Sequence, residues 1–140
     1  MTFVKGVGQD LRRTICIDMD GVLVDFRNCS VECDGYDNYP ANHKKLRRMS
    51  CPPMIGAREK LQQCRDMGLT IVIMTGRCEE ERAVTEEWLK KHEIPYDDLI
   101  MDKPRAMIYV DDLAHRFDGW ENTFEAIKKT HEHIKKNTEE

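Results

Sequence analysis

The sequence has no apolar run that approaches the roughly 20 residues a helix needs to cross a membrane. It also has no excess of basic charge, because 22 Lys and Arg residues stand against 26 Asp and Glu, for a net charge of -4. A membrane span and a membrane partner are therefore not expected, and a strongly basic nucleic-acid binder is disfavoured. Residues 1–13 contain no long apolar stretch. We therefore expect no secretory signal and a cytoplasmic protein.

The six cysteines include no C-x-x-C pair, and Cys29 and Cys33 have no second pair at zinc-finger spacing. In a cytoplasmic protein this pattern favours reduced thiols over disulfides. A zinc site formed by Cys29, Cys33, His43 and Cys51 is a less favoured alternative, because the spacing of these residues is poor.

A chain of 140 residues has room for one domain of ordinary size. We expect a single domain over residues 1–140, with a polar tail that frays over 135–140. Short apolar runs alternate along it with stretches of helical periodicity. Such alternation predicts an α/β fold, with a three-layer, Rossmann-like parallel sheet. The predicted strands cover residues 14–17, 69–74, 98–101 and 106–110, and the predicted helices cover residues 55–67, 79–92 and 120–134.

Polar side chains follow each predicted strand at the point where the strand ends. Because the carboxyl ends of parallel strands share one edge of a sheet, we expect these groups in one crevice. Carboxylates are the ligands that Mg²⁺ prefers, and a hydroxyl, a free backbone amide and an ammonium suit a phosphoryl group. In chain order the groups are Asp18 and Asp20, then Thr75 and Gly76, then Lys103, then Asp111 and Asp112.

These residues form four short motifs, which together resemble those of the haloacid dehalogenase (HAD) superfamily. The motifs occur in the order found in that family, and with the intervening strands they cover about residues 14–120. A response-regulator receiver uses similar groups in a different order, which argues against that fold. The four motifs are Asp18-Met19-Asp20-Gly21-Val22-Leu23, Thr75-Gly76-Arg77, Lys103-Pro104 and Asp111-Asp112.

The resemblance implies roles for the two acids of the first motif. Asp18 would be the nucleophile, which forms an aspartyl-phosphate, and also a ligand of Mg²⁺. Asp20 would protonate the leaving group and later activate water, while its backbone carbonyl reaches the metal. Dehalogenases of this family lack the second acid, whereas its phosphatases keep it. The presence of Asp20 therefore favours a phosphatase.

The remaining motifs would bind the phosphoryl group and the metal. The resemblance implies that the hydroxyl of Thr75 and the amide of Gly76 hold the phosphoryl oxygens. Lys103 would neutralise charge on the nucleophile and phosphate. Asp111 would bind Mg²⁺, with Asp112 as a second ligand or as support for the first.

We therefore expect a Mg²⁺-dependent phosphomonoester hydrolase that acts on a small phosphorylated molecule, either a sugar phosphate or a nucleotide. One alternative is a polynucleotide 3'-phosphatase, which would act on a nucleic-acid end and is disfavoured by the net negative charge. A second alternative is a non-catalytic, HAD-like module that binds phosphate.

Residues 26–53 occupy the place where members of this family insert a cap domain. The segment is too short for a helical cap, so we expect a flap and a nearly capless enzyme. Capless members act on large substrates or borrow a lid from a neighbouring subunit, which allows for a homo-oligomer. A basic cluster in this flap would attract an anionic substrate, although a solvated helix face is the slightly favoured interpretation, since charge runs usually lie on the surface. The candidate substrate contacts are Lys44, Lys45, Arg47 and Arg48, together with Arg77.

Overall fold

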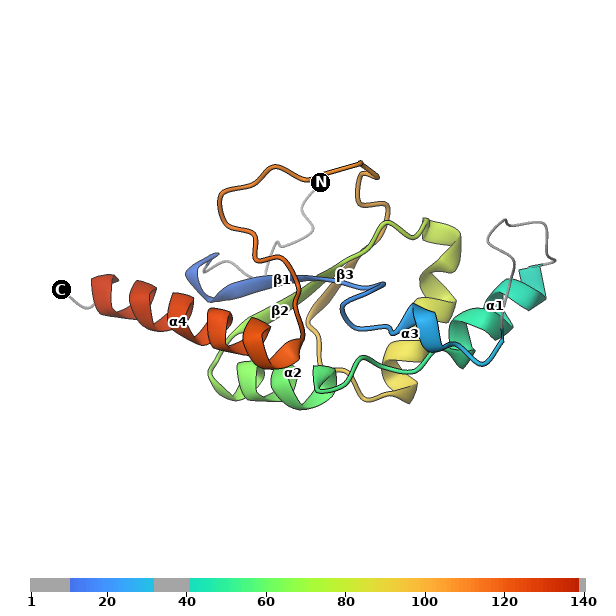
Figure 1. The fold of residues 1–140 in the computed structure, drawn as a ribbon, viewed down its shortest axis with the longest axis horizontal. Coiled ribbons are helices and arrows are strands. Elements are labelled where there is room, and N and C mark those ends of the chain that lie inside the picture. Colours follow the sequence, from blue (N-terminus) through green and yellow to red (C-terminus); the bar gives the residue numbers. More distant parts are fainter. Residues whose placement is uncertain (1–10, 32–40, 139–140) are drawn as a thin grey trace.

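Within the part of the chain that the structure describes, the sheet has three parallel strands. The computed structural model describes residues 11–31 and 41–138. The strands are β1 (Thr14–Asp18), β2 (Thr70–Met74) and β3 (Asp98–Ile100), in the order β1-β2-β3 (Figure 1). In the register, Asp18 lies beside Met74, and Met74 lies beside Ile100. The predicted α/β class and parallel sheet are thus confirmed, as are three of the four predicted strands.

Among the described residues, four α-helices accompany the sheet. They are α1 (Ala41–Ser50), α2 (Ala57–Asp66), α3 (Arg82–Lys91) and α4 (Trp120–Thr138). The last three confirm the predicted helices with shifted ends. Helix α4 continues to Thr138, so residues 135–138 of the predicted frayed tail are helical, and residues 139–140 lie outside the described part. Lys135 and Lys136 favour this last turn, since cations stabilise the negative end of a helix. No helix among the described residues is long and apolar enough to span a membrane.

The core forms around β2, whose residues Ile71, Val72 and Ile73 are fully buried. A strand covered on both faces in this way is typical of parallel sheets. Helix α2 packs on β2, and α4 packs on α2. Trp88 and Trp120 are buried, as the sequence predicts. The indole N–H groups of Trp88 and Trp120 donate to the carbonyls of Cys51 (2.7 Å) and Val22 (2.8 Å), so both rings also fix the loops beside the sheet.

The predicted strand at residues 106–110 does not form. This part of the chain carries no regular structure, and Met107 and Val110 are 99% and 93% exposed (upper, orange segment in Figure 1). Local contacts take the place of a strand ladder. The hydroxyl of Tyr109 donates to the carbonyl of Pro104, and the ammonium of Lys103 lies 4.4 Å from the centre of the Tyr109 ring. The segment is thus folded on itself beside the sheet.

The two ends of the 26–53 insertion are joined, which the sequence analysis did not anticipate. Val24 and Pro53 form an antiparallel bridge, and the amide of Asp25 donates to the carbonyl of Pro52 at 2.9 Å. These contacts bring Cys29 and Cys51 together in a disulfide, so the prediction of reduced thiols is wrong for this pair. In the disulfide, Cys29 and Cys51 are not thiolates, so they cannot serve as ligands of the alternative zinc site. Its other members, Cys33 and the side chain of His43, lie outside the described part of the chain.

Loss of this disulfide should lower stability. The bond spans a sequence separation of 22 residues, for which loop-closure entropy predicts a loss of about 3 kcal/mol on removal. For a chain of this length, we expect Cys29→Ser to lower the melting temperature by about 10 °C. Calorimetry of the oxidised protein and the variant measures this shift. Cys16→Ser, at an exposed free thiol, is the matched control, and an equal melting temperature for both variants would contradict the prediction.

Candidate functional site

Three of the four motifs meet at the carboxyl edge of the sheet. Asp18 ends β1 directly beside Met74, the last residue of β2. The amide of Thr75 donates to the carbonyl of Ile100 (2.9 Å), and the amide of Lys103 donates to the carbonyl of Thr75 (2.8 Å). The backbone therefore brings Asp18, Thr75 and Lys103 to one edge, as the strand pattern predicts.

Thr75 and Gly76 form the turn that follows β2. Thr75 is only 1% exposed, and its hydroxyl oxygen accepts a bond from the amide of Arg77 at 3.2 Å. Because the hydroxyl acts as an acceptor in this bond, its O–H remains able to donate to the oxygen of a bound group. The carbonyl of Gly76 accepts from the Arg105 side chain at 3.3 Å, which holds the turn against the chain that follows Lys103.

Asp18 is half-buried at the end of its strand. Its Oδ1 atom accepts a bond from the amide of Met19 at 2.9 Å, which fixes the orientation of the carboxylate. The chain then leaves the strand in a tight loop, in which the amides of Leu23 and Val24 donate to the Met19 carbonyl. Gly21 permits this loop, because its φ of +88° is unfavourable for other residues.

The loop directs the carboxylate of Asp20 to the guanidinium of Arg77. The Nε and Nη2 atoms of Arg77 donate to the two oxygens of Asp20 at 2.9 and 2.7 Å, in a bidentate pair. Burial alone would raise the pKa of Asp20. The bonds from Arg77, together with the charges of Arg77, Arg48 and Arg47, outweigh this effect and lower the pKa. Asp20 is thus held as a carboxylate in the described arrangement.

Arg77 is buried and positions the carboxylate of Asp20. Its side chain is 2% exposed, and its third donor, Nη1, bonds to the hydroxyl of Thr85 at 3.0 Å. For Arg77 the sequence favours structural hydrogen bonds, with a substrate contact as the less favoured alternative. The bonds to Asp20 and Thr85 confirm the first, and the substrate contact stays a prediction. Thr85 was not predicted, because a buried threonine on a helix has no distinctive sequence signal.

The basic cluster of the insertion pairs with an acidic side chain within α3 and with one in the turn that precedes it. Lys45 pairs with Glu87 at 3.5 Å, and Arg48 pairs with Glu81 at 3.0 Å. Arg48 also reaches Asp20 at 3.6 Å, so α1 contributes directly to the edge of the candidate site. Lys44 acts electrostatically on Glu80, and its substrate contact stays a prediction, as does that of Lys45.

The fourth motif is not gathered with the other three. Asp111 and Asp112 are exposed in the irregular segment, where Asp111 accepts a bond from the amide of Leu113 at 2.7 Å. Across residues 11–31 and 41–138, no three His, Cys, Asp or Glu side chains come close enough to hold a metal ion. The carboxylates are suited to Mg²⁺ in kind, but their described arrangement does not fit a bound ion.

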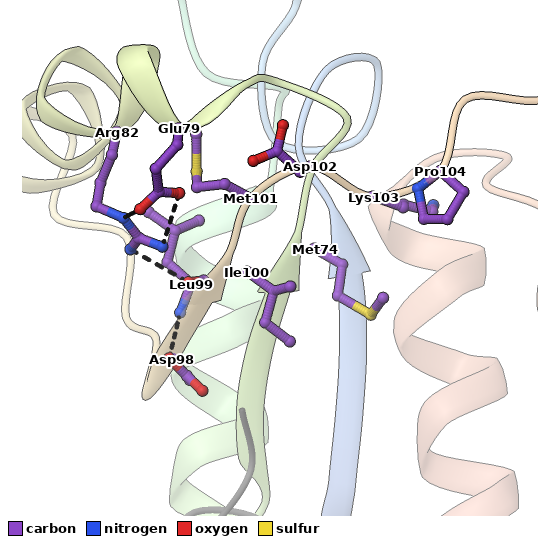
Figure 2. Close-up of a pocket in the computed structure, with 10 residues that line it drawn as sticks. All are labelled: Met74, Glu79, Arg82, Asp98, Leu99, Ile100, Met101, Asp102, Lys103 and Pro104. Carbon is purple, nitrogen blue, oxygen red and sulfur yellow. Dashed lines mark hydrogen bonds and ion pairs between the residues drawn. The ribbon is translucent and has the colours of Figure 1, made fainter. Parts of the chain in front are cut away.

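A pocket of about 640 Å³ adjoins the candidate site on the side of β3 (Figure 2). Lys103 and Met74 lie at its border with the site, whereas Asp18, Asp20 and Thr75 do not line it. Its far wall is held by Arg82, which pairs with Glu79 at 2.7 Å and donates to the carbonyl of Leu99 (Figure 2). The convergence of the motifs, rather than this pocket, therefore defines the candidate site.

Comparison with known proteins supports the fold and nothing finer. No family model matches the sequence, and no curated protein matches it. A crystal structure of a structural-genomics target from Vibrio cholerae is similar, with a TM-score of 0.56 and 22% sequence identity. The match covers 87% of this chain and 98% of that one. At this identity the likeness shows a shared fold alone, and the α/β fold with its parallel sheet is compatible with a Rossmann-like core.

Proposed function

We propose that this protein hydrolyses phosphomonoesters through an aspartyl-phosphate on Asp18. The observation that carries the proposal is the position of Asp18 at the end of β1, beside the turn of Thr75 and the backbone of Lys103. A nucleophilic carboxylate, a hydroxyl donor and an ammonium are the groups that phosphoryl transfer needs. We propose further that the core has the three-layer arrangement of the HAD family, with residues 26–53 as a flap.

In the proposed reaction, an oxygen of Asp18 attacks phosphorus, and the ester oxygen leaves with the electrons of its bond. Asp20, when protonated, gives its proton to this oxygen and then removes a proton from the water that attacks the phosphorus of the aspartyl-phosphate. Inorganic phosphate leaves and Asp18 is regenerated. Thr75, Gly76 and Lys103 hold the phosphoryl oxygens and balance their charge throughout.

A requirement for Mg²⁺ is part of the proposal, with Asp18, Asp20, Asp111 and Asp112 as the candidate ligands. When bound, the ion would neutralise charge on the phosphoryl oxygens. This requires the segment that carries Asp111 to approach Asp18. Among the described residues, β1 pairs only with β2, and the exposed apolar run at 106–110 is suited in sequence to pair with the other edge of β1.

A small phosphorylated molecule, either a sugar phosphate or a nucleotide, is the proposed substrate class. The net charge of -4 favours it over a polynucleotide end. A non-catalytic, phosphate-binding module is the second candidate. It is favoured by the dispersed acidic residues and by the pairing of Asp20 with Arg77, which holds the proposed acid in its ionised form.

Phosphate release from a panel of phosphomonoesters tests the proposed function. The panel holds sugar phosphates, nucleotides and a 3'-phosphorylated oligonucleotide, each assayed with Mg²⁺ and with EDTA. We expect release from at least one small substrate with Mg²⁺, and a loss of about 100-fold or more in EDTA. Release that is equal in both buffers would contradict the metal requirement. Phosphate binding without any release would favour the non-catalytic module.

A further inference from the structure

Helix α1 carries two arginines near the carboxylate of Asp20, although Arg77 already donates to both oxygens of that carboxylate. Arg77 satisfies both oxygens of Asp20 at 2.7 and 2.9 Å, whereas Arg48 approaches the same carboxylate at only 3.6 Å. Arg47 is also close enough for its charge to act on Asp20. Arg48 and Arg77 thus share the carboxylates of Asp20 and Glu81, and Arg47 adds a third guanidinium that forms no ion pair among the described residues.

Arg47 carries the clearest sign of a missing partner. Its Nε atom is buried and has no hydrogen-bond partner among the residues that the structure describes. A buried donor without an acceptor is costly and uncommon in folded proteins. Because Arg47 as a whole is only partly buried, an anionic group beside Arg47 and Arg48 would supply an acceptor for its guanidinium.

We propose that Arg47 and Arg48 bind a second anionic group of the substrate, which is therefore a small phosphomonoester that carries a further phosphate or carboxylate. This inference rests on the proposed function. The α-carbons of Asp18 and Asp20 lie at most about 7 Å apart, since they are two residues apart in the chain. Arg48 lies 3.6 Å from the Asp20 carboxylate, so the proposed second anion would bind close to the phosphoryl group on Asp18, as on one small molecule.

The same contacts argue against a polynucleotide as the ligand. Tight binding to a nucleic-acid backbone uses several cations along the strand. Here Lys45 faces Glu87, and Arg48 is already shared with Glu81, so the cluster offers a single anion site rather than a basic track. The proposed ligand is thus a small molecule with one additional anionic group close to the phosphate that is hydrolysed.

Matched substrates that differ by one phosphate test this site. We compare adenosine 3',5'-bisphosphate with adenosine 3'-monophosphate, and glucose 1,6-bisphosphate with glucose 6-phosphate. The wild-type protein should prefer at least one bisphosphate by about tenfold in kcat/KM, mainly through a lower KM. In Arg47→Gln and Arg48→Gln this preference should fall to about twofold or less. Hydrolysis of the monophosphates with no preference for either bisphosphate would overturn the inference while leaving the proposed function intact.

Arg58→Gln is the matched control, because it removes one arginine charge at a surface residue that pairs with Glu93 at 2.9 Å rather than with Asp20 or Glu81. We expect it to keep the wild-type ratio between the two substrates of each pair. An equal loss of the ratio in this variant would show a general charge effect and overturn the inference. So would a 3'-phosphorylated oligonucleotide that is hydrolysed more efficiently than every small substrate.

A binding measurement separates this inference from the proposed function. Calorimetric titration of adenosine 3',5'-bisphosphate and glucose 1,6-bisphosphate into Asp18→Asn requires no turnover. Adding Arg47→Gln to this variant should weaken binding of the preferred bisphosphate about tenfold, even if no substrate in the panel is hydrolysed. Unchanged binding, or no binding of either bisphosphate before the substitution, would overturn the inference.

Discussion

Asp18→Asn is expected to reduce phosphate release by about 10⁴-fold or more. The amide cannot serve as the nucleophile, and loss of a covalent nucleophile has effects of this order in other hydrolases. The fold should survive, because an amide oxygen at this position can still accept the bond from the Met19 backbone. The measurement is kcat on the best substrate of the panel, together with urea unfolding of both proteins.

Asp25→Asn is the matched control for this prediction. Asp25 lies in the same loop region but its carboxylate accepts a bond from the side chain of Asn28 at 2.6 Å, at an exposed position. We expect its kcat within about twofold of the wild type, since its carboxylate bonds to Asn28 and to no residue of the candidate site. If Asp18→Asn retained more than about one per cent of the wild-type rate, covalent catalysis by Asp18 would be refuted.

The elements that the sequence predicted correctly are those whose signal is local. Residues 69–74 form a run that is apolar except for Thr70, and this pattern identifies the buried central strand. Gly68, with a φ of +85°, marks the end of α2 and the turn into that strand. Parallel pairing then places Asp18, Thr75 and Lys103 at one edge without knowledge of any side-chain contact.

The strand predicted at 106–110 failed because strand formation depends on a partner. An apolar run favours a strand only where a neighbouring edge accepts its hydrogen bonds. Here the backbone at Asp102 adopts a φ of 59°, and its amide donates to the carbonyl of Arg77 at 2.8 Å, so the chain turns across the end of β2. The position of Asp111 and Asp112 depended on this strand, and no pattern within the segment reveals the turn.

Two contacts could not be predicted for a different reason. They are the ion pair of Asp20 with Arg77 and the disulfide of Cys29 with Cys51. The first joins residues 57 positions apart, and the second joins residues 22 positions apart. Such contacts are determined by the loop after β1 and by the bridge of Val24 with Pro53, which have no periodic signal. Single-sequence patterns identify which residues reach an edge, but not which of them bind one another there.

Arg77→Ala is expected to destabilise the protein by about 3 kcal/mol. Removing one partner of a buried ion pair leaves the other charge uncompensated, an effect of about 3–5 kcal/mol. We expect the lower end of this range, because the side chain of Asp20 is 31% exposed and Arg48 remains within 3.6 Å of it. The variant also leaves the fully buried hydroxyl of Thr85 without the donor it now has.

Urea unfolding of the wild-type protein and the variant measures this loss, provided that the slope of the transition stays constant. Arg58→Ala is the matched control, because Arg58 pairs with Glu93 at 2.9 Å on the surface, where such pairs contribute less than about 1 kcal/mol. Arg77→Lys should recover less than half of the lost stability, since an ammonium cannot reproduce the two parallel bonds to Asp20 and the third to Thr85. A loss below about 1 kcal/mol in Arg77→Ala, equal to that in Arg58→Ala, would mean that the bidentate pair does not hold the Asp20 loop.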